Sequence, residues 1–109
     1  MSSDNDTSIA DLRRLVAKFI ADRSWEPYHS PKNLAMSIAI EAAELMEHFQ
    51  WMSAQESINY LDNPESKAAV ADELADVVIY CLSLANRSGI DLTKAVIKKV
   101  QRNQDRFPA

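Results

Sequence analysis

Residues 30–51 are SPKNLAMSIAIEAAELMEHFQW, and residues 63–80 are NPESKAAVADELADVVIY. Each stretch opens with a residue that can cap a helix, followed by proline at the first helical position, where the missing N–H costs nothing. Each continues in an apolar pattern rich in Ala, Leu and Glu, which favours helix. The two stretches therefore predict two helices, the first ending near Trp51 and the second near Ser88, just before Gly89.

The rest of the chain fits the same all-α fold class. One glycine and four prolines in 109 residues are too few for a turn-rich β protein. Capping residues predict further helices over about 8–23, 53–61 and 91–106, with a loop over 24–30. We expect a disordered leader over residues 1–7 and one helical domain over residues 8–109, folded as a bundle of four to five helices.

Charge and composition exclude several classes of protein. A net charge of −4 argues against broad binding to nucleic acid, which needs a large basic surface. The opening residues MSSDNDTS are polar and lack the apolar region of a signal peptide, and no stretch offers the roughly 18 apolar residues of a membrane span. We expect a cytoplasmic protein with neither a membrane nor a nucleic acid polymer as partner. Cys81 lies in the apolar run VVIYCLSLA, which favours a buried structural thiol over a nucleophile.

Two pairs of carboxylates stand out. Glu41 and Glu44 lie one turn apart on one predicted helix, and Glu73 and Asp76 lie one turn apart on the other. Solvated surface acids are the ordinary explanation of such pairs, but none of the four has Lys or Arg three or four residues away. Both pairs interrupt apolar segments that normally face a core. Two helices packed side by side would bring four carboxylates together.

Such a cluster needs a cation to offset its repulsion, and oxygen ligands without thiolate or imidazole select Mg²⁺ or Mn²⁺. A di-iron bundle uses Glu-x-x-His, whereas the residue three after Glu44 is Glu47. Magnesium held by carboxylates commonly completes its shell with substrate phosphates. The predicted ligand is therefore a phosphorylated molecule.

In these motifs the chain resembles the MazG-like superfamily of all-α nucleoside triphosphate pyrophosphohydrolases, closest to its dCTP pyrophosphatase branch. The resemblance covers about residues 10–108. It is carried by five ordered blocks, which are Trp25-Glu26, residues 29–34 (HSPKNL), residues 41–45 (EAAEL), residues 49–51 (FQW) and residues 73–80 (ELADVVIY), and it closes with Lys99, Asn103 and residues 106–108 (RFP).

The resemblance implies a Mg²⁺-dependent enzyme that hydrolyses dCTP or a modified dCTP to the monophosphate and pyrophosphate, which cleans the nucleotide pool. Glu41, Glu44, Glu73 and Asp76 are the implied metal ligands, and Glu41 or Glu44 is the candidate catalytic base. Mn²⁺ is a possible substitute for Mg²⁺. Two alternatives stay open, which are a pyrophosphohydrolase for another nucleotide (dUTP, an oxidised purine triphosphate or phosphoribosyl-ATP) and a non-enzymatic helical interaction protein.

The resemblance also implies substrate-binding residues. A flat nucleobase can stack on aromatic rings or on a histidine, although an aromatic residue taken alone more often belongs to the core. Lys99, Asn103 and Arg106 share one helical face that suits phosphate, although a solvated basic face is also possible. The candidates for binding the nucleobase are Trp25, His29, Trp51 and Tyr80. His48 lacks such support, and we expect it to be an exposed polar residue.

Assembly is the last expectation. A small helical bundle leaves apolar stripes that one copy does not cover. Members of the family form dimers or pairs of dimers, with the site near the interface. We therefore expect a homotetramer, with a dimer as the minimum.

Overall fold

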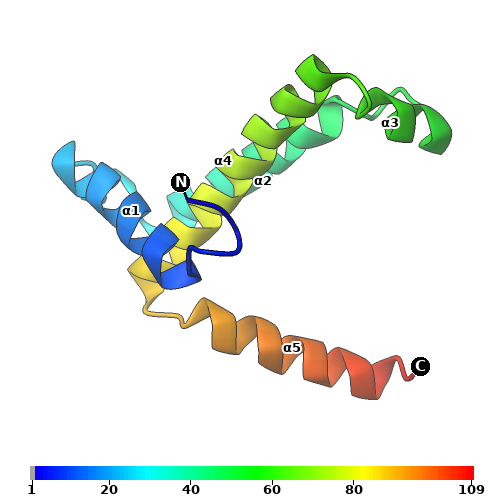
Figure 1. Cartoon of the computed structure of the whole chain (residues 1–109). Coiled ribbons are helices and arrows are strands. Elements are labelled where there is room, and N and C mark those ends of the chain that lie inside the picture. Colours follow the sequence, from blue (N-terminus) through cyan, green and yellow to red (C-terminus); the bar gives the residue numbers. More distant parts are fainter. Residues whose placement is uncertain (1) are drawn as a thin grey trace.

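The computed structural model describes residues 2–109 of the protein, which contain five α-helices, one short 3-10 helix and no strand. This confirms the all-α prediction (Figure 1). The elements in chain order are α1 (Ile9–Asp22), η1 (Glu26–Tyr28), α2 (Pro31–Glu47), α3 (Ala54–Tyr60), α4 (Pro64–Ser88) and α5 (Leu92–Arg106).

The helices begin where the sequence offers a side chain to cap them. Ser8 and Ser53 each form a full capping box, in which the hydroxyl accepts from a backbone N–H three residues later and that residue's carboxylate accepts in return. Ser30, Asn63 and Asp91 accept from the first-turn N–H groups of α2, α4 and α5. The predicted starts of all five α-helices are confirmed.

Helix ends were harder to predict. Gly89 adopts the left-handed conformation, with φ 64°, and ends α4 as expected. The helix α2, however, ends at Glu47 and not near Trp51. After Glu47 the bonding tightens, because the N–H of Phe49 donates to the carbonyl of Met46 at 2.9 Å, and the chain turns. No glycine or proline marks this end in the sequence.

The core is built on α4. α2 lies alongside it, and α1 packs across its C-terminal half (Figure 1). The buried apolar side chains of the described residues are few and come from these three helices. They are Val16, Leu34, Leu82 and Ala85. Cys81, expected to be buried, is a half-buried free thiol.

A polar latch joins α1 to the end of α4. The Arg13 guanidinium donates to Asn86 Oδ1 at 2.8 Å and to the carbonyl of Ile90 at 2.6 Å. The Asn86 side-chain amide donates back to the carbonyl of Arg13 at 3.1 Å. One side chain of α1 thereby fixes both the last turns of α4 and the segment that leads into α5.

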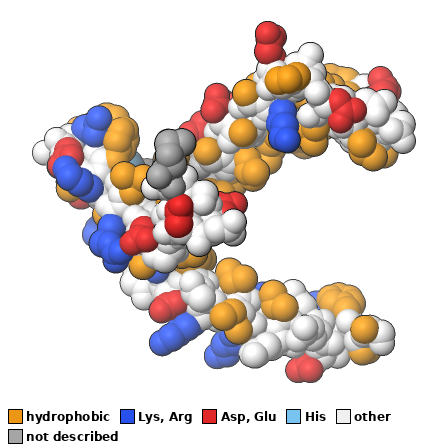
Figure 2. All heavy atoms as spheres, viewed as in Figure 1, with side chains coloured by type: hydrophobic (Ala, Val, Ile, Leu, Met, Phe, Trp, Pro, Cys, Tyr) orange, Lys and Arg blue, Asp and Glu red, His pale blue; other side chains and the backbone are white. Residues whose placement is uncertain are grey.

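The helix α5 leads away from the other helices (Figure 1), and within it only Leu92 is even half-buried. Apolar side chains line its edge toward α2 and α4, across a wide gap, in the space-filling view (Figure 2). Val96, Ile97 and Val100 are each about half exposed. A single chain therefore does not close the predicted bundle.

Residues 2–7 precede α1. They contain a turn in which the N–H of Asp6 donates to the carbonyl of Ser3. The disordered leader stays a prediction, and its first residue lies outside the described residues. No helix in residues 2–109 combines the length and the apolar character needed to cross a membrane.

Candidate active site

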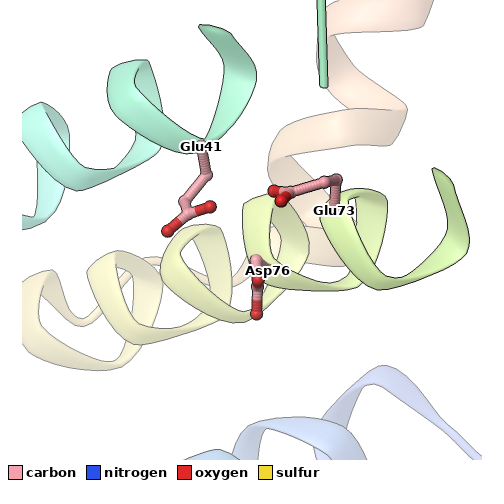
Figure 3. A group of neighbouring side chains, drawn as sticks. All are labelled: Glu41, Glu73 and Asp76. Atoms are coloured by element: carbon pink, nitrogen blue, oxygen red, sulfur yellow. The ribbon is translucent and has the colours of Figure 1, made fainter. Parts of the chain in front are cut away.

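Three carboxylates meet where α2 faces α4. Glu41 reaches from α2 toward α4, which carries Glu73 and Asp76 (Figure 3). One oxygen from each of the three lies within 4.8 Å of the others, and all three residues are half-buried. The helical spacing and the pairing of the two helices thus produce the juxtaposition that the sequence predicted.

The fourth predicted carboxylate, Glu44, lies beside this group. It is exposed, and it lines an open cleft of about 460 Å³ together with Glu73. Glu47, His48 and Tyr60 line the same cleft. The structure therefore brings all four carboxylates to one place, with Glu44 at its solvent-exposed edge.

The cluster perturbs its own ionisation. A hydrogen bond shared with Glu44, followed by burial and the neighbouring Glu73, raises the pKa of Glu41 to about 7. Burial and the nearby charge of Glu44 also raise the pKa of Glu73. Both ion pairs among residues 2–109, Arg14–Asp11 and Lys18–Asp22, lie on α1, so no Lys or Arg offsets the cluster.

The donor atoms suit a hard divalent cation. Glu41 Oε2 and Glu73 Oε2 are shielded from solvent and have no hydrogen-bond partner among the described residues. Buried carboxylate oxygens without partners are costly, and a bound cation would satisfy both. The group contains only oxygen ligands, which Mg²⁺ and Mn²⁺ prefer.

His48 and Tyr60 also belong to this region. His48 is half-buried and its Nδ1 lies 3.4 Å from the Tyr60 hydroxyl, so the expectation of an exposed His48 is wrong. The Phe49 ring packs edge-to-face on Tyr60 at 5.8 Å. The early end of α2 turns His48 and Phe49 toward α3. The sequence signal for Tyr60 was weak, a single aromatic residue at the end of a short capped helix.

The predicted base-binding residues are distributed around α4. Tyr80 is half-buried one turn after Asp76, and His29 is half-buried at the end of η1. Trp25 packs edge-to-face on Phe19 at 5.7 Å. Trp51 is 89% exposed in the turn after α2, so it is not a core residue of this chain.

The structure does not bring the predicted phosphate-binding residues to the carboxylates of the same chain. Lys99, Asn103 and Arg106 are exposed on α5, the helix that leads away from α2 and α4 (Figure 1). The Arg106 guanidinium lies over the Phe107 ring at 5.0 Å. None of the three contributes a side-chain hydrogen bond to the site of its own chain.

Known proteins are similar to this chain over the region that contains the carboxylates. The model of the MazG-like family matches residues 36–109, which include all four carboxylates. The chain belongs to the MazG-like family. Over 103 residues this MazG-like chain is 43% identical to dCTP pyrophosphatase 1 of Rattus norvegicus, with 94% of the chain and 61% of that relative covered.

Two further proteins show the same similarity. The dCTP pyrophosphatase 1 of Homo sapiens is 41% identical over 104 residues, with 95% of this chain and 61% of that protein covered. The MazG-like chain thus spans about three fifths of the length of these curated relatives. The crystal structure of a pyrophosphatase from Archaeoglobus fulgidus superposes with a TM-score of 0.86 at 40% identity and covers 93% of both chains.

Proposed function

We propose that the protein is a Mg²⁺-dependent nucleoside triphosphate pyrophosphohydrolase that converts dCTP, or a modified dCTP, to the monophosphate and pyrophosphate. The observation that carries this proposal is the meeting of Glu41, Glu73 and Asp76 without a cationic side chain among them. The names of the relatives, which are dCTP pyrophosphatases and a pyrophosphatase, support both the reaction and the substrate.

In this proposal Glu41, Glu73 and Asp76 hold the metal, with Glu44 beside them. A bound Mg²⁺ would neutralise triphosphate oxygens and lower the pKa of water, and Mn²⁺ is a possible substitute. We place the general base at Glu44, because an oxygen of Glu41 already belongs to the three-carboxylate group. Glu44 is exposed at the cleft, where it can accept a proton from an attacking water. Glu41, which shares a hydrogen bond with Glu44, is the alternative general base.

The aromatic candidates would bind the nucleobase of the substrate. Tyr80 lies on α4 one turn beyond Asp76, so a base bound there would be close to the phosphates. Trp51 leaves a large apolar ring in water, as expected of a residue that is covered only by a ligand or a second copy. Trp25 and His29 lie at the two ends of η1, and in this proposal they contact the nucleobase from there. Stacking on such rings contributes about 1–3 kcal/mol per base.

The proposal includes assembly into a homotetramer, with a dimer as the minimum. The chain exposes 8446 Å², whereas a compact monomer of 12.3 kDa is expected to expose about 6,100 Å². Its radius of gyration is 16.3 Å, against about 13 Å for a compact domain of this length. The excess of about 2,300 Å² per chain matches a permanent interface rather than a transient one. Lys99, Asn103 and Arg106 would then act at the site of a neighbouring copy.

The decisive experiment is pyrophosphate release from a panel of nucleotides with Mg²⁺, with Mn²⁺ and with EDTA. We expect dCTP or a modified dCTP to be the best substrate and EDTA to abolish turnover. A preference for dUTP or a purine triphosphate would overturn the proposed substrate but support the proposed reaction. Turnover in EDTA, or no turnover of any nucleotide, would rule out the proposal of a metal-dependent enzyme. If Mg²⁺ also left the melting temperature unchanged, the helical interaction protein would remain.

A further inference from the structure

A second cavity lies near the C-terminal end of α4, where Ser83, Asn86 and Arg87 line it. It has a volume of about 210 Å³ and lies between α1, η1 and α4. Its polar lining residues are Glu26, His29, Ser83, Asn86 and Arg87. A cavity of about 150 Å³ holds a benzene ring. This cavity therefore suits a single small ring better than a whole nucleotide.

Two of its polar atoms have no partner. Ser83 is 4% exposed, and its Oγ is shielded from solvent and forms no hydrogen bond with the described residues. A serine inside a helix commonly either faces solvent or bonds the carbonyl four residues earlier, and Ser83 does neither. His29 Nδ1 is likewise buried and unpaired. Asn86, in contrast, is occupied by Arg13.

Unpaired buried groups cost free energy unless a ligand supplies the missing partner. A hydroxyl both donates and accepts a hydrogen bond, and the tautomer of His29 decides whether its Nδ1 donates or accepts. Together the two groups can complement a ligand edge that carries one donor beside one acceptor. The Watson–Crick edge of a pyrimidine has this pattern.

The position of Ser83 relates the cavity to the carboxylates. Ser83 follows Asp76 by seven residues, two turns along the same face of α4. That spacing corresponds to a rise of about 10 Å. Tyr80 lies between them on this face. A nucleotide with its phosphates at the carboxylates would place the ring face of its base beside Tyr80 and the Watson–Crick edge toward the cavity.

We propose that this cavity is the base-edge subsite, and that Ser83 and His29 bind the Watson–Crick edge of a pyrimidine. Ser83 is then a specificity-determining residue on α4, separate from the rings that stack on the face of the base. This inference rests on the proposed function for the triphosphate, but the cavity itself is testable with a nucleoside that has no phosphate.

The experiment compares wild type with Ser83→Ala, using Ser88→Ala as the control because Ser88 is exposed on the same helix. The substrates are dCTP and base-free 2-deoxyribose 5-triphosphate, each with Mg²⁺. We expect kcat/KM for dCTP to fall about tenfold in Ser83→Ala, mainly through KM, which corresponds to one lost hydrogen bond. Turnover of the base-free triphosphate should not change. The melting temperature should stay the same or rise, because the removed hydroxyl is unpaired.

Binding of 2′-deoxycytidine provides the readout that does not depend on hydrolysis. We expect its titration into ¹⁵N-labelled wild type to shift the amides of residues 26–29 and 83–87, and these shifts to weaken in Ser83→Ala. If no nucleotide is hydrolysed, the proposed function fails while this titration still decides the cavity. Equal losses for dCTP and the base-free triphosphate, unchanged dCTP kinetics, or the absence of shifts with 2′-deoxycytidine would each overturn the subsite.

Discussion

Glu73 is the residue whose charge is explained most directly by metal binding. Its neighbours within the cluster are all acidic, and its Oε2 is buried without a partner. Glu73→Gln keeps the shape and removes the charge, so we expect pyrophosphate release from dCTP to fall by about a hundredfold or more as the metal is lost or misplaced. The melting temperature in EDTA should rise, because one of several mutually repelling carboxylates is neutralised.

Asp72→Asn is the matched control, since Asp72 is the exposed acidic residue directly before Glu73. It should change neither measurement. Normal hydrolysis by Glu73→Gln would remove Glu73 from the site. A Glu73→Gln protein that does not fold would instead make Glu73 a structural residue.

The raised pKa of Glu41 predicts how the metal-free protein responds to pH. An unfolded glutamate releases its proton near 4.5, whereas folded Glu41 retains it until about pH 7. Between these values the folded state binds a proton that the unfolded state has released, so stability falls as pH rises from about 5 to about 7. Thermal melts in EDTA across this range measure the effect.

Glu41→Gln is the control for this prediction and should make the slope smaller, leaving the contribution of Glu73, whose pKa is also raised. The carboxylates that cap helices, Asp11 and Glu56, have lowered pKa values and stay charged across this range. They therefore add no slope of their own. With Mg²⁺ the slope should reverse, because the cation binds the deprotonated carboxylates. A flat wild-type profile in EDTA would contradict the raised pKa of Glu41.

At the scale of residues, the sequence predicted the carboxylate group because helical spacing alone places Glu41 with Glu44, and Glu73 with Asp76. It missed Ser83 and the contact of His48 with Tyr60. Both depend on where other segments of the chain return in space. A serine in the apolar run VVIYCLSLA is ordinary until the structure shows that it lines one cavity together with Glu26 and His29.

Among the elements, α4 depends most clearly on one backbone position. Gly89 has φ 64°, and a Cβ placed there would meet no atom within 4 Å. Gly89→Ala should therefore cost only the penalty of the left-handed conformation, about 1 kcal/mol. Urea unfolding measures this cost, and Ser88→Ala, one residue earlier, is the control. A cost near zero would mean that α4 can end elsewhere.

Helix starts were predictable because the capping residues are local signals, as Ser8, Ser53 and Asp91 show. The end of α2 at Glu47 was not, because its tightened last turn carries no glycine or proline. The direction of α5 could not be predicted either. Its amphipathic pattern shows that one face should be covered, without showing by which surface.

At the scale of the whole molecule, we expect assembly through apolar faces such as the one between α1 and α4. There Leu15, Phe19 and Val78 help to line an apolar cavity of about 510 Å³. Light scattering after gel filtration should give the mass of a tetramer, or at least of a dimer, of the 12.3 kDa chain. Leu15→Glu, at a position 65% exposed in the single chain, should lower that mass.

Ala21→Glu is the matched control because Ala21 lies on the opposite face of α1 and should leave the mass unchanged. A wild-type monomer at micromolar concentration would contradict the assembly. It would also leave the exposed apolar surface of α5 without explanation. The same measurement therefore tests whether Lys99, Asn103 and Arg106 can reach any site.

The Arg13 latch also has a consequence for the order of folding. It joins residues 73 and 77 positions apart along the chain, whereas Glu41 and Asp76 are only 35 positions apart, on helices joined by residues 48–63 and the short helix α3. Closing the shorter loop costs less entropy, so α2 and α4 should pair first and α1 should dock afterwards. The orientation of α5 is then fixed only in this last step, which makes docking of α1 the event that prepares the chain to meet its copies.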